Sequence, residues 1–289
     1  MQKLRTPLLG LALLAAAACQ APEDDVAIPW TEIPGTLGAA PLAGRPFSLS
    51  PSGRYLLYLR EFGGAVPLLD GPDRRDLTAA YRLVDLRDLT TRQPPALRPE
   101  QLDALLAPGA VHLLTAGCWL ADRDRVTVST DEPRHLVLDA GAATLDWQVI
   151  ARDALQPEPR CPLPQPPPRS PFTVGAFVVD QGGDQGLVVR VADDPTRRLL
   201  QLEAGVGEYV VTAARAAPDG RRLALLYTRA TGSFVGRQHA VLIDAGAGVV
   251  RRLGQGFSQL AWTPDGRGLI AFGRLDGERR WGLYRLALE

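Results

Sequence analysis

A turn sequence built from proline, a small polar residue and glycine recurs along this chain and constrains its fold more than any other feature. Ser-Pro-Ser-Gly-Arg occupies 50–54, Ala-Pro-Asp-Gly-Arg occupies 217–221 and Thr-Pro-Asp-Gly-Arg occupies 263–267. Proline presets the second position of a tight turn, Asp or Ser suits the third, and glycine supplies the left-handed residue that closes it. The expected turn positions are Pro51, Gly53, Pro218, Asp219, Gly220, Pro264, Asp265 and Gly266.

Two fainter copies of the same unit complete the series. The segment 118–128 has Ala121 in the place of the proline, and the segment 169–179 has Pro171 there, which adds Pro171 to the expected turn positions. Measured at this place, the copies stand at 51, 121, 171, 218 and 264, so the successive intervals are 70, 50, 47 and 46 residues. A repeat of this length indicates an array of similar supersecondary units.

Each unit contains the pattern of about four short strands. The strand after the turn is apolar almost continuously, as at 56–59 and 269–272, which is typical of a strand that is buried on both faces. A later strand ends near Asp85, Asp139, Asp193 or Asp244, which predicts a structural turn or cap in four of the units. A lone sheet of this kind cannot cover both apolar faces, so the units are expected to pack around an axis as an all-β β-propeller.

The turn pattern resembles the WD40-like repeats of the TolB propeller family, and the resemblance extends over residues 45–289. It implies a β-propeller of four-stranded blades and no particular activity. Rings of the TolB type usually have six blades, whereas five units are visible in this sequence. The 70-residue first interval either holds a short amphipathic helix at 99–106 or hides a sixth, eroded blade.

The last unit lacks the pattern of a final outer strand after the apolar segment 281–287. We expect a segment within 26–44 to supply that strand and to close the ring by joining the first and last parts of the domain. The alternative is that this segment is only a disordered tether.

The first residues have the pattern of a secretory signal peptide. Lys3 and Arg5 precede an apolar run of eleven residues, 8–18. The run is too short for a membrane-spanning helix, which needs about 20 residues. The chain is therefore expected to divide into a signal peptide (1–18), a tether with the closing strand (19–44) and the propeller (45–289).

The segment Ala16-Ala17-Ala18-Cys19 resembles a bacterial lipobox, although the family prefers Leu where Ala16 stands. The resemblance implies cleavage before a lipidated Cys19, so that acyl chains would anchor the protein to a membrane. Ordinary cleavage after an Ala-x-Ala site is the alternative. Gln20 follows in place of the Asp that retains such proteins in the inner membrane, which implies an outer-membrane location facing the periplasm.

Two further cysteines, Cys118 and Cys161, form an even pair in a chain that is expected to be exported. A disulfide between them would close a loop of about 42 residues, and two free thiols are the alternative. Cys161 lies in the proline-rich segment 157–171, which predicts polyproline II or irregular structure rather than a strand.

The composition excludes two classes of protein. An apolar fraction of 46% suffices for a packed core and argues against a disordered chain. The 32 basic and 32 acidic residues become 30 and 32 when residues 1–18 are removed, and nucleic-acid binding would need a basic excess. We expect no nucleic-acid partner.

Catalytic and metal-binding signals are weak. The sequence has no Gly-x-Ser-x-Gly motif, and His112, His135 and His239 lack zinc-type spacing. The acid-rich segments 70–76 and 180–184 do not fit a calcium loop and are explained by turn chemistry. We therefore expect no catalytic residues, no metal and no cofactor.

Two functions remain after these exclusions. The first is a lipid-anchored, non-catalytic module of the cell envelope that binds a protein partner. The alternative is a propeller that binds or hydrolyses a glycan or another ligand in its axial funnel, with carboxylates and tryptophans such as Trp119 or Trp262 lining the pocket. Both tryptophans stand two residues before the proline place of their units, which favours packing between blades over a ligand surface.

Overall fold

The computed structural model describes residues 30–40, 47–60, 80–105, 114–121, 123–129, 134–155, 170–181, 186–203, 205, 208–231, 234–235, 237–275 and 280–288. Among these residues nearly all regular structure is β, arranged in five antiparallel sheets with four strand positions each. The helices among them are short, α1 (Pro99–Leu105) and the 3-10 helix η2 (Arg152–Ala154). The all-β fold with five four-stranded blades is confirmed. No helix in this part of the chain is long and apolar enough to cross a membrane.

The first two sheets come from the N-terminal half. The first sheet contains β2 (Ala39–Ala40), β3 (Phe47–Leu49), β4 (Tyr55–Arg60), β5 (Tyr81–Asp85) and β6 (Thr90–Arg92), with β2 and β3 both pairing with β4. The second sheet contains β7 (Leu114–Trp119), β8 (Arg125–Ser129), β9 (Arg134–Asp139) and β10 (Trp147–Ala151). The helix expected at 99–106 is present as α1 in the interval between these sheets.

The other three sheets follow in order along the chain. The third sheet contains β11 (Phe172–Val174), β12 (Phe177–Gln181), β13 (Leu187–Val191) and β14 (Arg198–Leu202). The fourth contains β15 (Glu208–Ala216), β16 (Arg222–Thr231), β17 (Phe234–Val235), β18 (His239–Asp244) and β19 (Val249–Gln255). The fifth contains β20 (Phe257–Trp262), β21 (Gly268–Gly273) and β22 (Gly282–Ala287), and it is completed by β1 (Thr31–Glu32).

The strand β1 adds to the last sheet from the other end of the chain. Thr31 pairs with Arg285 in antiparallel register, and the N–H of Ile33 donates a 2.9 Å hydrogen bond to the carbonyl oxygen of Leu283. Since β1 lies within 26–44, the strand that the sequence predicts for this segment is present. The outermost position of the fifth sheet is thereby filled.

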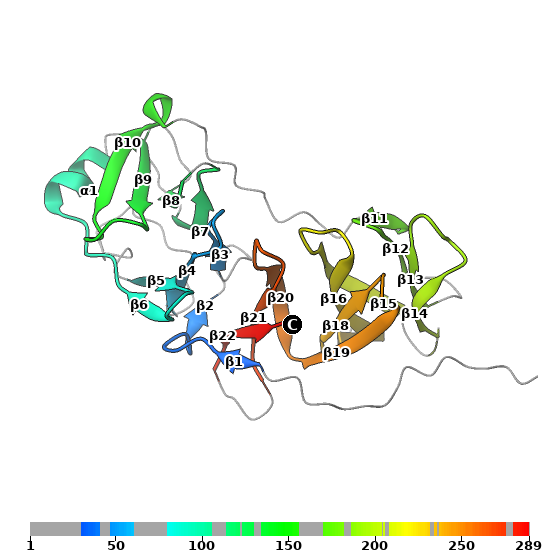
Figure 1. Cartoon of the computed structure of the whole chain (residues 1–289). Coiled ribbons are helices and arrows are strands. Elements are labelled where there is room, and N and C mark those ends of the chain that lie inside the picture. The colour runs from blue at the N-terminus through cyan, green and yellow to red at the C-terminus, as the bar shows by residue number, and fades with distance from the viewer. Residues whose placement is uncertain are drawn as a thin grey trace, which may run out of the picture.

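Four clusters of buried hydrophobic residues show which sheets are neighbours. They lie between the second and first sheets, the first and fifth, the fifth and fourth, and the fourth and third. Figure 1 shows the resulting row, with the second sheet at the left end and the third sheet at the right end. None of the clusters among the described residues joins the second sheet to the third. The closing of this row into a ring stays a prediction.

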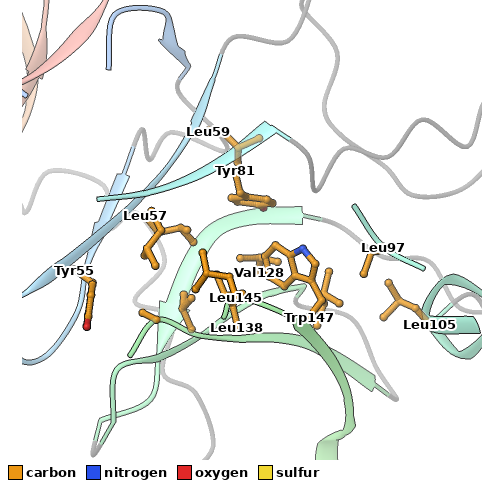
Figure 2. Packing of buried hydrophobic residues seen from close by; sticks show 14 residues of the cluster. Tyr55, Leu57, Leu59, Tyr81, Leu97, Leu105, Val128, Leu138, Leu145 and Trp147 are labelled. Atoms are coloured by element: carbon orange, nitrogen blue, oxygen red, sulfur yellow. The ribbon is translucent and has the colours of Figure 1, made fainter. Parts of the chain in front are cut away.

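The cluster between the first two sheets illustrates how each interface is built. Leu57 and Tyr81 of the first sheet face Val128 and Trp147 of the second, all fully or almost fully buried (Figure 2). The Trp147 indole also donates a 2.9 Å hydrogen bond to the carbonyl oxygen of Pro95. Burying large side chains in this way contributes about 2 kcal/mol each, which makes the interface between sheets the main source of cohesion.

Candidate functional site

Three of the expected turns share one geometry. Gly53, Gly220 and Gly266 have φ values of 71°, 70° and 69°, in the left-handed region that a side chain disfavours. The N–H of each glycine donates a 2.8 Å hydrogen bond to the carbonyl oxygen three residues before it. These turns join β3 to β4, β15 to β16 and β20 to β21, and they contain Pro51, Pro218 and Pro264.

The third residue of each turn accepts a hydrogen bond from the backbone beyond the glycine. Asp219 Oδ1 accepts from the N–H of Arg221 at 2.9 Å, and Asp265 Oδ1 accepts in the same way from Arg267 at 2.9 Å. In the first sheet the hydroxyl of Ser52 takes this place. Serine and aspartate are interchangeable here because both carry a short acceptor. Two hydrogen bonds lower the pKa of Asp265. The larger effect comes from the Thr263 hydroxyl and the smaller from the backbone N–H of Arg267.

Neighbouring turns also bind one another. The Ser52 hydroxyl donates to Asp124 Oδ2 at 2.9 Å and so joins the first sheet to the second. Arg222 Nη2 donates to the carbonyl oxygen of Gly266 at 2.9 Å, which joins the fourth sheet to the fifth. The N–H of Ala176 donates to the carbonyl oxygen of Gly220 at 3.1 Å, which joins the third sheet to the fourth.

The first and fifth sheets meet at the same end through direct packing. A Cβ at Gly53 would lie 2.4 Å from Pro264 Cδ, so only glycine allows the two turns to approach this closely. We call this end of the row the corner rim, formed by Ser52, Gly53, Asp124, Ala176, Gly220, Arg222, Pro264 and Gly266. Its residues are engaged in holding adjacent sheets together. The sequence-predicted turn residues therefore gather at one rim and serve the fold.

The third sheet departs from the expected turn position. Pro171 lies immediately before β11, whereas the turn between β11 and β12 is formed by Gly175 and Ala176. This hairpin has a two-residue loop with Gly175 at φ 58°, so the longer proline turn of the other sheets is absent. A side chain at Gly175 would also meet the Cβ of Ala216 at 2.8 Å. The proline of this copy marks the entry into the sheet.

The recurring aspartates cap the ends of the third strands. Asp85, Asp139 and Asp244 each accept a hydrogen bond from the backbone N–H two residues later, at 3.1, 2.9 and 2.8 Å. In the third sheet this contact is made by Asp194, whose Oδ1 accepts from the N–H of Thr196 at 3.1 Å. The expectation for Asp193 was therefore wrong by one residue, because β13 ends at Val191 and the chain turns one position later.

Asp85 has a second role in the first sheet. Arg54 donates to its Oδ2 from both Nε and Nη2, at 2.9 and 2.7 Å. Burial by itself would raise the pKa of Asp85, but the hydrogen bonds from Arg54 and Arg87 outweigh burial and lower the pKa to about 2. The carboxylate therefore stays ionised over the physiological range and ties two strands together.

The two tryptophans of the alternative hypothesis lie between sheets. The Trp119 indole donates to the hydroxyl of Ser48 at 3.0 Å, and the Trp262 indole donates to the carbonyl oxygen of Arg215 at 2.7 Å. Ser48 lies on β3 of the first sheet and Arg215 on β15 of the fourth, so each partner belongs to the sheet next to that of its tryptophan. Both indoles thus act in packing between sheets.

Several predicted residues lie outside the described part of the chain. These are Cys19 with the whole of 1–29, the acid-rich segment 70–76, His112 and Cys161. Cys118 is on β7 and is 5% exposed, and its pairing with Cys161 stays a prediction. Asp180 accepts a 2.8 Å hydrogen bond from the Ser170 hydroxyl and pairs with Arg190 at 3.0 Å. Within the described residues, no three His, Cys, Asp or Glu side chains are grouped to hold a metal ion.

A group of aromatic rings and an arginine lies at the opposite end of the fourth sheet. We call Tyr209, Tyr227, Arg229 and His239 the aromatic–arginine cluster. Tyr209 pairs with Arg229 across β15 and β16, and Tyr227 pairs with His239 across β16 and β18. Tyr209 lies at the start of β15, and the other end of this strand leads into the turn at Pro218 on the corner rim. The cluster therefore lies on the opposite rim.

The rings of this cluster contact one another in sequence. The guanidinium of Arg229 lies over the Tyr209 ring, with 5.6 Å between Cζ and the ring centroid. The Tyr209 and Tyr227 rings meet edge to face at 6.0 Å, and Tyr227 stacks on His239. Burial raises the pKa of Tyr227. Burial also lowers the pKa of His239, assisted by the charge of Arg252, so the imidazole is neutral at pH 7.

Sequence reasoning missed this cluster because its members are distant along the chain. Tyr209 and His239 are brought together only by the register of three strands. The sequence shows only that Tyr227 and Arg229, two residues apart on one strand, lie on the same face. It does not show that Tyr209 and His239 lie beside them.

A comparison with protein-family models finds no match for this chain, and neither does a comparison with curated proteins. Among solved structures, the chain is similar to the β-propeller domain of Myceliophteria thermophila Cps50 (Swd1), at 10% identity over 88% of this chain and 98% of that one, with a TM-score of 0.28. It is also similar to an oligogalacturonate lyase in complex with manganese, at 12% identity over 84% and 76%, with a TM-score of 0.21. The Dos1 propeller is similar at 11% identity over 84% and 55%, with a TM-score of 0.23.

Proposed function

We propose that this protein is a non-catalytic, protein-binding module of the bacterial cell envelope, anchored by a lipid on Cys19. The observation that carries the proposal is the aromatic–arginine cluster on the rim opposite the corner rim. Tyr and Arg are the residue types that most often dominate the binding energy of protein interfaces. Tyr209, Arg229 and His239 are each half-buried, so their outer parts are available for contact.

The rigid frame of the sheets supports the same function. Hydrogen bonds and close packing at the corner rim join neighbouring sheets, and buried clusters continue these contacts through the interfaces. A frame of this kind fixes the opposite rim, so that this surface loses little conformational entropy when a partner docks. Binding surfaces are typically presented in this way by rigid β scaffolds.

The lipid anchor would keep this rim close to a membrane. The twelve residues from Cys19 to Trp30, the first described residue, can span at most about 40 Å when fully extended. A partner would therefore be another envelope protein near the same membrane. The alternative of a ligand pocket lined by Trp119 and Trp262 is less favoured, because both indoles are hydrogen-bonded between sheets.

The test is site-specific photo-crosslinking in the native envelope with the full-length protein. A crosslinking residue at the exposed Gln255, which pairs with His239, samples the proposed surface, and one at the exposed Asp219 samples the corner rim. We expect a discrete crosslinked partner from Gln255 and none from Asp219. Cys19→Ser should move the protein from the membrane to the soluble fraction. Recovery of no partner above background from Gln255 would contradict the function.

A further inference from the structure

We propose that the aromatic–arginine cluster, together with Arg252, binds the carboxylate of an aspartate or glutamate in an acidic segment of the protein partner. This inference rests on the proposed function and specifies its site and the chemistry of the partner. Its elements are two arginines that form no ion pair with a described residue, a set of rings that holds one of them in place, and a glycine that leaves space for it.

The charge of Arg229 is not neutralised within the described part of the protein. Arg54, Arg190 and Arg222 each form an ion pair with an aspartate, whereas Arg229 makes none with any described residue. Its Nε is buried and has no hydrogen-bond partner among these residues. A guanidinium has five N–H donors in a planar fork that matches a carboxylate, and the Nη groups of the half-buried Arg229, which form no hydrogen bond with a described residue, favour an incoming carboxylate.

Arg252 supplies a second positive charge on the same face of the sheet. It pairs with Val241 across β18 and β19, and directly paired residues of an antiparallel sheet share a face. Its charge acts on both rings: it adds to the effect of burial in lowering the pKa of His239, and it opposes burial, which raises the pKa of Tyr227. Arg252 is exposed and forms no ion pair with a described residue. The rings therefore lie between two cationic groups.

No described carboxylate neutralises these charges from a neighbouring strand. Glu208 precedes Tyr209 and so projects from the opposite face of β15, and Glu203 follows β14 without forming an ion pair with a described residue. The Gln181 side chain, which reaches the cluster end of the sheet from β12, is occupied by a 2.5 Å hydrogen bond from the N–H of Val211. The described residues of the site therefore carry a positive charge, which is complementary to an acidic group.

Gly205 gives independent support because it leaves space for the arginine. A Cβ at this position would lie 2.1 Å from Arg229 Nη2, although the backbone φ is not in the left-handed region. The absence of a side chain therefore serves the placement of the guanidinium rather than a turn. The Tyr209 ring holds the guanidinium from another side, so its orientation is set before a ligand arrives.

The rings indicate a protein carboxylate rather than a free anion. A small anion would use only the two guanidinium groups. A peptide segment would also cover the half-buried Tyr209 ring with the apolar part of its side chains. Aromatic and arginine side chains acting together are characteristic of such protein contacts.

The experiment measures binding of two matched peptides to the full-length protein in detergent micelles. One fluorescent peptide contains Glu and Asp next to a Leu, and its twin has Gln and Asn at the same positions. Fluorescence anisotropy should show that the acidic peptide binds about tenfold more tightly than its twin. This difference should shrink when the salt concentration is raised, because exposed charges are screened.

Four variants test the residues. Arg229→Gln and Arg252→Gln should each lower the affinity for the acidic peptide about tenfold and remove the preference over the twin. Gly205→Ala should have the same effect without changing any charge. Arg251→Gln is the matched control, since Arg251 is equally exposed but pairs with Leu242 on the other face, and it should leave binding unchanged. Arg252 is exposed, so its variant tests the site even if a change at Arg229 impairs folding.

Three results would overturn the inference. The first is equal binding of the two peptides, and the second is an equal loss of affinity in Arg251→Gln and Arg252→Gln. The third is arginine-dependent binding of polygalacturonate or phosphatidylglycerol vesicles in place of the peptide.

The crosslinking experiment separates this inference from the proposed function. If the partner still crosslinks at Gln255 in the Arg229→Gln and Arg252→Gln variants, the protein-binding function stands and the carboxylate site is wrong. If no partner crosslinks in the wild type, the function itself is wrong.

Discussion

The ring of Tyr227 stacks on the imidazole of His239, with centroids 5.3 Å apart and planes inclined by 16°. This pair connects the buried interface between the third and fourth sheets to the half-buried rim. Burial, with a smaller effect of Arg252, keeps the imidazole neutral in the folded protein. The stability of this end of the sheet should therefore depend on pH.

The first prediction concerns His239. Its pKa in the folded protein is below the ordinary value of 6.5, so the unfolded chain binds the proton more readily. The contribution of His239 to stability is complete above pH 6.5 and is lost as the pH falls through the folded pKa. In urea unfolding, the wild type should lose stability relative to His239→Phe between pH 7.5 and pH 5. A constant difference across that range would show that protonation of His239 is not coupled to folding.

The second prediction concerns Arg54 and Asp85. The pKa of Asp85 is about 2 in the folded protein against an ordinary value of 3.8, so its contribution is present above pH 3.8 and is lost as the pH falls towards 2. Arg54→Met should lower the free energy of unfolding at pH 6, measured by chemical denaturation. The difference in this free energy between the variant and the wild type should become smaller below pH 4. Arg267→Met is the matched control, because Arg267 follows a turn glycine but forms no ion pair with a described residue. Equal losses in the two variants would refute the role of the ion pair.

The third prediction compares two glycines with the same backbone. Gly53 and Gly220 have φ values of 71° and 70°, but only Gly53 has a neighbour that a Cβ would strike, namely Pro264. Gly220→Ala should cost about 1 kcal/mol in unfolding free energy from backbone strain alone. Gly53→Ala should cost about 1–3 kcal/mol more, since the first and fifth sheets must move apart. If chemical denaturation showed equal losses of unfolding free energy in the two variants, the turn at Gly53 would not be in contact with the turn at Pro264.

The fourth prediction concerns Cys118 and Cys161. If they pair, neither should react with iodoacetamide in denaturant until a reductant is added. Cys161→Ser should release Cys118 for alkylation and lower the unfolding free energy by roughly 3–4 kcal/mol in the chain-entropy model. Mass spectrometry of the unreduced protein would decide the matter. Full alkylation of both thiols in the wild type would exclude the bond.

Much of the fold could be predicted from the sequence because the relevant interactions are local. The turn at 50–53 needs only its own four residues, and β4, whose first five residues are buried, follows it as a continuous apolar run. The same holds for β21, which is buried along its whole length. The strand predicted within 26–44 was inferred because the last unit lacks an outer strand, and β1 occupies that position.

The errors and omissions arise from information that is not local. The displacement at Pro171 follows from a two-residue hairpin loop between β11 and β12, and that at Asp193 follows from the end of β13 at Val191. The aromatic–arginine cluster depends on the registers of β15, β16 and β18, and a one-residue slip would separate its members. The order of the sheets likewise depends on β1, which places the first sheet beside the fifth.

The pairing of Thr31 with Arg285 has a consequence for how the protein acquires its structure. Among the described strands, the first to be synthesised has no pairing partner until the last one has been made. A nascent chain therefore exposes an incomplete fifth sheet, and that sheet is completed only when its C-terminal strand arrives. Contacts of such long sequence separation make folding slow, so the unfinished chain is exposed to aggregation during its synthesis.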